Sequence, residues 1–378
     1  MKKIISISNS KNFSLVNRID DSKKQNFKNR VIVSIFVVLY YLLVLVVTLL
    51  SDDVYKDYSS FDWIQNKTLE TLKPYFAILL MLIIFVPFVF CLVEASYLIF
   101  RKYERIPIFL VVFFCTIAYL LPLCYFIASR LFININENVG DYYLRGSYIA
   151  ILFGFASLLI LLVSINIILS IYKRNNFKNV ITLNTLAIII TLGFSGFVFM
   201  AIFKGWLAIL FLLLSVVITD VMCYISGMLF GKHKMAKFIS PNKTWEGAII
   251  GSSFSTGILI LFCFFLTFDN KKIVTKDLFR WRFNIENIVS FKTEKDYNLW
   301  LLLLFVSILL VIFSIMGDLL FSYVKRKFNI KDFSNFLRSH GGFLDRVDSL
   351  LVTSLTFFVY TLVAIGIHSF VMFNSPKW

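Results

Sequence analysis

Nine long apolar segments run through this chain of 378 residues, and they constrain its fold more than any other feature. A helix that crosses the hydrocarbon core of a bilayer needs roughly 20 apolar residues. Segments of this kind lie at residues 31–50, 76–100, 107–131, 148–172, 180–203, 205–230, 247–268, 299–321 and 349–373. Hydrophobic residues make up 59% of the chain and charged residues 16%, a balance that a water-soluble globular protein of this length would not reach. The sequence therefore predicts an all-α, polytopic integral membrane protein with about nine transmembrane helices.

Some of these boundaries are weakly defined. Little more than Lys204 and Gly205 separates the fifth segment from the sixth, and Pro87, Pro107 and Pro122 can kink or shorten helices. The five cysteines all fall inside apolar segments and form no CxxC pair, so the sequence suggests neither a disulfide framework nor a zinc site.

Lys and Arg residues predict which helix ends face the cytoplasm, because positively charged loops stay on that side. Residues 1–30 hold eight Lys or Arg against two Asp and contain no small-residue cleavage site, so we interpret them as a retained cytoplasmic tail. The other segments on this side are then also basic: 101–105, 173–178, 231–246 and 322–348. Segment 269–298 fits the opposite side least well, but one span fewer would put the last two polar loops on opposite sides of the membrane. The two most unusual polar loops are 231–246 and 322–348, and we therefore expect them to share the cytoplasmic face.

Four acidic residues lie within or at the edge of the apolar segments: Glu94, Asp220, Glu246 and Asp318. A charged group at such depth costs roughly 2.5 to 3.5 kcal/mol on insertion, so each is a candidate functional residue. No chemically suggestive residue surrounds Glu94, and we interpret it as an interfacial carboxylate that reaches water. Asp220 and Asp318 each stand near the cytoplasmic end of a segment that leads into one of the two polar loops.

The first polar loop combines hydroxyl groups and lysines next to the start of a helix. Pro241 predicts a rigid turn, and Thr244 can cap a helix that begins near Glu246. Together with Ser240 and Lys243, such residues can bind phosphate oxygens at a helix start. An ordinary cytoplasmic loop with a helix cap explains the same residues equally well.

The second polar loop is more specific. Asp345 and Asp348 are three residues apart and share one face of a helix, where they repel each other unless a cation lies between them. Oxygen ligands favour Mg²⁺, which leaves positions for water and phosphate oxygens. Gly341 and Gly342 allow the backbone to approach a phosphate and to point amide groups at it. Carboxylates beside Lys and Arg are what phosphoryl or nucleotidyl transfer requires.

These loops resemble the signature of a known family, the CDP-diacylglycerol synthases or phosphatidate cytidylyltransferases. The stretch SYVKRKFNIKDFSNFLRSHGGFLDRVD fills the family pattern with Ser322, Lys325, Arg326, Lys331, Asp332, His340, Gly341, Gly342, Asp345, Arg346 and Asp348. The upstream pieces DVMCYISG, GKHK and SPNKTWEG are similar to a second block of the family. The resemblance covers about the C-terminal half, from Asp220 to Asp348. Arg338 stands where Pro or Gly is usual, and Cys223 stands where Ala is usual.

The resemblance implies transfer of a cytidylyl group from CTP to phosphatidic acid, with Mg²⁺ as cofactor; a second, monovalent cation stays open. Its implied metal ligands are Asp318, Asp345 and Asp348, with Asp220 as a fourth candidate. Lys325 and His340 complete the catalytic candidates, and the candidate substrate-binding residues are Asp220, Ser240, Lys243, Thr244, Glu246, Ser322, Arg326, Lys331, Asp332, Gly341, Gly342 and Arg346. The phosphate nucleophile is already ionised, so we expect His340 to hydrogen-bond a phosphate or orient a carboxylate.

We therefore divide the chain into a tail at 1–30, an N-terminal membrane region at 31–203 and a catalytic membrane region at 204–378, with 269–298 as a probable insertion. The expected location is the plasma membrane, with phosphatidic acid and other membrane lipid as partners, no nucleic acid, and a homodimer left open. Two rival functions remain: a CTP-dependent kinase of a polyprenol or similar lipid alcohol, and a proton-coupled anion transporter that uses Asp220 and Asp318 as relay groups.

Overall fold

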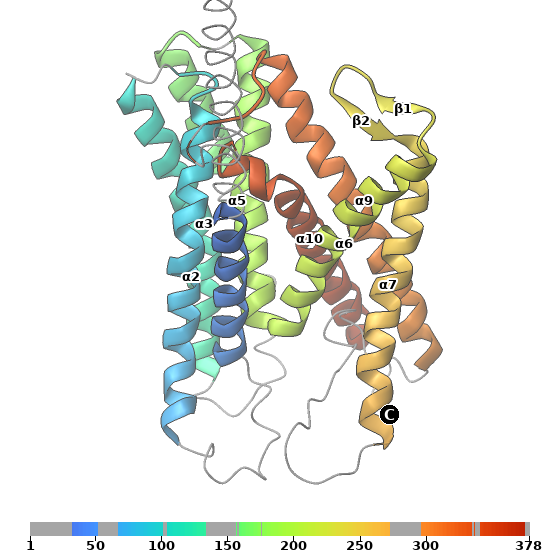
Figure 1. Ribbon diagram of the computed structural model, residues 1–378. Helices are drawn as coiled ribbons and strands as arrows, with labels where there is room; N and C mark the ends of the chain where they lie inside the picture. The colour runs from blue at the N-terminus through green and yellow to red at the C-terminus, as the bar shows by residue number, and fades with distance from the viewer. Residues whose placement is uncertain are drawn as a thin grey trace, which may run out of the picture.

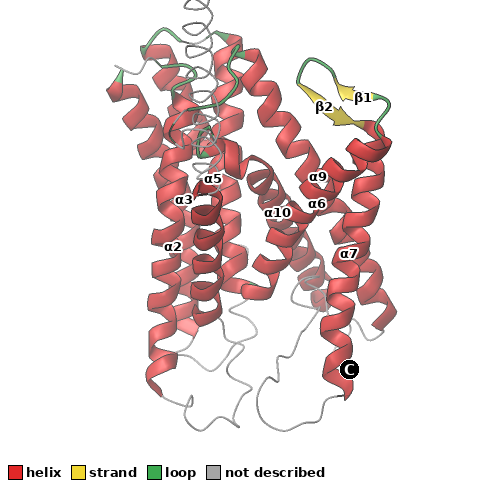
Figure 2. Cartoon of the chain, in the orientation of Figure 1, coloured by secondary structure: helices red, strands yellow, loops and turns green. Residues whose placement is uncertain are grey.

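The computed structural model describes residues 32–51, 67–100, 104–133, 156, 159–174, 176–272, 296–334, 336 and 341–374. Its helices are α2 (Lys67–Ser96), α3 (Arg105–Ile133), α5 (Phe177–Phe203), α6 (Trp206–Phe230), α7 (Trp245–Lys272), α9 (Asp296–Lys327) and α10 (Leu344–Asn374). Two further helices span Ile32–Ser51 and Leu159–Ile171. The strands β1 (Lys234–Ala236) and β2 (Ser240–Thr244) pair antiparallel between α6 and α7. Figure 2 shows how small this hairpin is beside the helices, which confirms the predicted fold class.

Each of the nine expected transmembrane segments overlaps a helix. Within the described residues, seven helices are long and apolar enough to cross a membrane. The third and fourth expected segments correspond to α3 and to the helix Leu159–Ile171. The tail at 1–30, residues 273–295 of the expected insertion and most of 148–158 lie outside the described residues.

The weakly defined boundary between the fifth and sixth segments is a sharp turn. Helix α5 ends at Phe203 and α6 begins at Trp206. Gly205 has φ of +81°, a conformation that a residue with a side chain rarely adopts. A glycine at this position therefore allows two membrane helices to follow each other with almost no loop.

The helices form two groups with α10 between them (Figure 1). On one side α2, α3 and α5 pack together, and on the other α6, α7 and α9 do so. Helix α10 packs against α5 and α2 of the first group and against α9 and α6 of the second. Because α10 contacts both groups, residues near its start can face side chains from either half of the chain.

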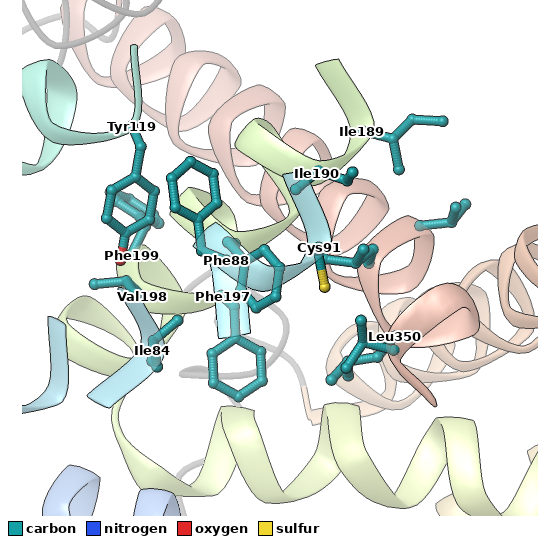
Figure 3. Packing of buried hydrophobic residues seen from close by; sticks show 14 of the residues in the cluster. Ile84, Phe88, Cys91, Tyr119, Ile189, Ile190, Phe197, Val198, Phe199 and Leu350 are labelled. Carbon is teal, nitrogen blue, oxygen red and sulfur yellow. The ribbon is translucent and has the colours of Figure 1, made fainter. Parts of the chain in front are cut away.

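The first group has an aromatic core, which Figure 3 shows from close by. The ring of Phe88 on α2 stacks on Tyr119 of α3, with the ring centroids 4.6 Å apart. Phe194 of α5 meets Phe88 edge-on at 5.8 Å. All three side chains are buried, and such ring pairs add specific geometry to the burial of apolar area. This packing fixes α2 against α5.

In the second group α6 and α7 approach each other closely. A Cβ atom at Gly251 would lie 2.6 Å from the Cα of Cys223, and one at Gly247 would lie 2.7 Å from the Cα of Gly227. Small residues at such crossings let helix backbones meet within a membrane. The close approach sets the position of the hairpin that joins the two helices.

The two polar loops lie at the same end of the molecule, as expected (Figure 1). The Nε atom of Arg326, at the end of α9, donates to the backbone oxygen of Ile239 in the hairpin turn over 3.3 Å. The same guanidinium donates through Nη1 to the oxygen of Ile330 at 3.4 Å. Arg326 therefore ties the hairpin to the segment that connects α9 with α10.

Candidate active site

Three carboxylates from three helices lie within electrostatic range of one another. Asp318 of α9 lies close enough to Asp220 of α6 and Asp348 of α10 for their charges to interact. Lys243 of β2 forms an ion pair with Asp318, with 2.6 Å between Nζ and Oδ2. Ser322, one turn further along α9, donates to Oδ1 of Asp318 at 3.3 Å. We call Asp220, Asp318 and Asp348 the carboxylate cluster.

Basic side chains follow the cluster at the end of α9. Its last turn carries Lys325, Arg326 and Lys327, where positive charge is favourable to the helix dipole. Asn329 follows with φ of +57°, a left-handed conformation that commonly terminates helices. Lys178 donates to the free carbonyl oxygen of Lys327 over 2.6 Å. These contacts hold the last turn of α9 in place.

Asp345 has different partners from Asp348. Its Oδ1 forms an ion pair with Lys325 at 2.9 Å, and its Oδ2 accepts the backbone amides of Phe333 at 3.0 Å and Gly342 at 2.8 Å. The side chain of Asp345 is only 3% exposed. Both oxygens are thus engaged within the protein, which corrects our expectation that Asp345 and Asp348 face one cation. We expected Asp345 to be the third carboxylate beside Asp318 and Asp348. The carboxylate that lies within electrostatic range of both is Asp220.

The glycine pair also differs from expectation. We predicted that Gly341 and Gly342 point backbone amides at a phosphate, but the amide of Gly342 donates to Asp345 instead. A Cβ atom at Gly341, where φ is +79°, would lie 2.8 Å from Oδ2 of Asp345. One at Gly342 would lie 2.6 Å from Oε2 of Glu94. The missing side chains make room for two carboxylates of the protein itself.

Glu94 is a residue next to the site whose partners the sequence reasoning missed. We interpreted it as a carboxylate that reaches water, yet it is 4% exposed and accepts hydrogen bonds from Ser334 and from the backbone amides of Phe343 and Leu344. Those partners lie about 240 to 250 positions later in the chain. The cost of placing a carboxylate at that depth was the one signal in the sequence that could have identified it.

The first polar loop is organised around two side chains. The hydroxyl of Thr244 accepts the backbone amide of Gly247 at 3.1 Å, which confirms the predicted cap of α7. Glu246 accepts the backbone amides of Lys232 and His233, each at 3.0 Å, and contacts the ring of His233 at 2.5 Å. Glu246 thus closes the base of the hairpin rather than joining the carboxylate cluster.

The remaining candidate residues from the sequence lie within the two polar loops, 231–246 and 322–348. Pro241, for which we expected a turn, lies within β2, because residues 237–239 make the turn instead. Ser240 pairs through its backbone with Ala236. Lys331, Asp332 and Arg346 are exposed. His340 and Arg338 lie outside the described residues, so their expected roles remain predictions.

The donor chemistry of the carboxylate cluster suits a hard divalent cation. Within the described part of the chain, no three His, Cys, Asp or Glu side chains are grouped closely enough to hold a metal ion among themselves. Mg²⁺ does not need such a group, because it binds through one or two carboxylates and fills its other positions with water and phosphate oxygens. Asp318 and Asp348 supply carboxylate oxygens of this kind, and Lys243 balances the charge of Asp318.

Long apolar helices that carry carboxylates and lysines near one end are the features of an integral membrane protein with a polar site. Residues 76–364 match the cytidylyltransferase family, and the chain belongs to that family. The resemblance seen in the sequence is thereby confirmed.

Individual relatives cover a smaller part. Phosphatidate cytidylyltransferase of Staphylococcus haemolyticus is 41% identical over 143 residues, which make up 38% of this chain and 44% of the relative. The protein of that name from Staphylococcus epidermidis is 39% identical over 148 residues, 39% of this chain and 46% of the relative. The one from Haemophilus influenzae is 34% identical over 158 residues, 42% and 46% respectively. The chain spans about half the length of these curated relatives.

Proposed function

We propose that this protein is a phosphatidate cytidylyltransferase, which joins the cytidylyl group of CTP to phosphatidic acid and releases pyrophosphate. The observation that carries the proposal is the carboxylate cluster with its bound Lys243. It is assembled from three membrane helices inside the residues that match the cytidylyltransferase family. Relatives that bear the name phosphatidate cytidylyltransferase support the same reaction.

The reaction demands positioning and charge compensation more than proton transfer. An oxygen of the lipid phosphate attacks the α-phosphorus of CTP, the bond from that phosphorus to the bridging oxygen breaks, and pyrophosphate leaves. The attacking phosphate is ionised near neutral pH, so no strong general base is required. Catalysis then comes from holding two anions in line and compensating their charge.

The residues of the site can divide this work. We propose that Asp318 and Asp348, with Asp220 nearby, hold Mg²⁺, which would neutralise charge on the triphosphate oxygens. Lys243 forms an ion pair with Asp318, and we propose that its ammonium moves to a phosphate oxygen when nucleotide binds. The ion pair of Lys325 with Asp345 keeps the start of α10 against the end of α9. The exposed Lys331 and Arg346 are candidates for the first contact with the incoming anions.

We further propose that the site faces the cytoplasm at the plasma membrane. A phosphatidic acid molecule keeps its acyl chains in the bilayer while its headgroup meets water-borne CTP, and only a site at the membrane edge serves both. The basic loops 231–246 and 322–348 favour the cytoplasmic side and attract anionic lipid.

A product assay with purified protein tests the proposal. The protein is incubated with CTP labelled at the α-phosphorus, phosphatidic acid and Mg²⁺, with each component omitted in turn. We expect a labelled lipid and one pyrophosphate for each lipid formed, and loss of both with Asp318→Asn. The matched control is Glu104→Gln, which removes a carboxylate paired with Arg174 and should keep activity. Release of labelled CDP would support a lipid kinase instead, and anion flux into proteoliposomes without Mg²⁺ would support a transporter.

A further inference from the structure

Glu94 occupies an unusual place for a carboxylate. It lies two residues before the end of α2 and is 4% exposed, in a helix that contributes none of the residues on which the proposed chemistry rests. Neighbouring Cys91, about one turn earlier, lies within electrostatic range of Glu94, Asp345 and Asp348. The end of α2 therefore borders the active site.

Within the described residues, the hydrogen bonds that Glu94 accepts come from the start of α10 and the segment before it. Oε1 accepts the hydroxyl of Ser334 at 2.6 Å and the amide of Phe343 at 2.9 Å. Oε2 accepts the amide of Leu344 at 2.8 Å. Gly342 packs against the carboxylate so closely that a Cβ atom would lie 2.6 to 2.9 Å from it. One buried side chain thus binds three hydrogen-bond donors and leaves no room for a side chain at position 342.

This arrangement satisfies backbone amides at the start of a helix that would otherwise have no hydrogen-bond partner. The first amides of a helix have no partner within the helix, and a negative charge there is favoured by the helix dipole. Helix α10 begins at Leu344, and the amides at and just before this start are taken by two carboxylates: that of Gly342 by Asp345, and those of Phe343 and Leu344 by Glu94 of α2. Two carboxylates from different helices therefore share the capping of one helix.

We infer that Glu94 is a positioning residue of the active site, a role that rests on the proposed function. It fixes the first turn of α10 so that Asp345 meets Lys325 and Asp348 lies within electrostatic range of Asp318. Its two oxygens accept hydrogen bonds from Ser334, Phe343 and Leu344, so groups of the protein itself compensate its charge. The N-terminal membrane region thereby supports a site whose chemical groups all come from the C-terminal half.

The variant Glu94→Gln tests this role with almost no change of shape. The amide keeps one accepting oxygen but turns an NH₂ group toward a backbone amide that also donates. We expect kcat for CDP-diacylglycerol formation to fall about 100-fold, the effect of misplacing reacting groups by about 1 Å. The KM values for CTP and phosphatidic acid should change less than about threefold, because residues outside α10 retain their charges. The surface variant Glu104→Gln should stay within about twofold of the wild type.

A second readout does not depend on activity. Hydrogen exchange in detergent micelles should quicken about tenfold at the amides of Phe343 and Leu344 in Glu94→Gln, as expected when a helix cap is lost. If the wild-type protein forms no CDP-diacylglycerol, the proposed function fails. The exchange result still tests whether Glu94 holds the start of α10 in place. Wild-type exchange at both amides, or a kcat within about twofold of wild type, would overturn the inference.

A milder variant covers the case in which Glu94→Gln does not fold. Ser334→Ala removes one hydroxyl donor to Oε1 of Glu94. It leaves the charge of Glu94 and its hydrogen bonds from the amides of Phe343 and Leu344 in place. We expect a smaller loss of the same kind, about threefold to tenfold in kcat with unchanged KM values, the usual effect of losing one supporting hydrogen bond. An increase in KM with unchanged kcat would show that this region binds substrate directly and would contradict the positioning role.

Discussion

Lys325→Met should destabilise the protein because it leaves a buried carboxylate without its counter-ion. The side chain of Lys325 is 13% exposed and that of Asp345 is 3% exposed, with 2.9 Å between their charged atoms. Breaking a buried pair by removing one partner typically costs about 3 to 5 kcal/mol. Two backbone amides still donate to Asp345, so we expect a loss of unfolding free energy near the lower limit, about 3 kcal/mol.

The double variant separates a lost charge pair from lost packing. Asp345→Asn alone keeps an oxygen that can accept the amides of Phe333 and Gly342, but its NH₂ group then meets the ammonium of Lys325. When both changes are combined, neither charge remains buried, so the double variant should be more stable than Lys325→Met. We expect a coupling free energy of about 2 kcal/mol between the two positions.

Unfolding by SDS titration in mixed micelles, followed by circular dichroism, measures these free energies. Lys327→Met is the matched control, because Lys327 stands in the same helical turn and its side chain makes one long contact within the described residues, 3.5 Å to the hydroxyl of Thr182. It should change the unfolding free energy by less than about 0.5 kcal/mol. A loss below about 1 kcal/mol in Lys325→Met, or additive effects in the double variant, would refute the reasoning.

Further predictions concern packing, charge and the metal. Gly251→Ala should separate α6 from α7 and destabilise the fold by about 1 to 3 kcal/mol, because its Cβ would lie 2.6 Å from the backbone of Cys223; an unchanged SDS midpoint would contradict this. Lys243→Met should lower kcat/KM at least about 100-fold, and equal activity would exclude it from the site. Removal of divalent ions with EDTA should abolish turnover, and Mg²⁺ should restore it. His340→Gln should lower the pH-rate profile without changing its shape, whereas loss of a limb near pH 6 to 7 would identify it as a base.

The sequence predicted the broad organisation because its signals are local. The length of an apolar run decides whether a segment can cross a bilayer, and each expected run overlaps a helix. The order of loops along the chain then predicted that 231–246 and 322–348 meet at one end, which Figure 1 shows. The cap at Thr244 was also predictable, because a capping hydroxyl and its amide are only three residues apart.

The partners of the acidic residues were not predictable in this way. Spacing on one helix paired Asp345 with Asp348, but Asp345 instead meets Lys325 of α9, and Asp220 of α6 joins Asp348 near Asp318. Glu94 showed no chemical context in the sequence, since its donors lie at the other end of the chain. Apolar length and loop charge are properties of a segment by itself, so the sequence alone determined the membrane helices. The partner of each carboxylate, whether a lysine, a backbone amide or another carboxylate, depends on how the helices pack. Only the tertiary structure decided these partners.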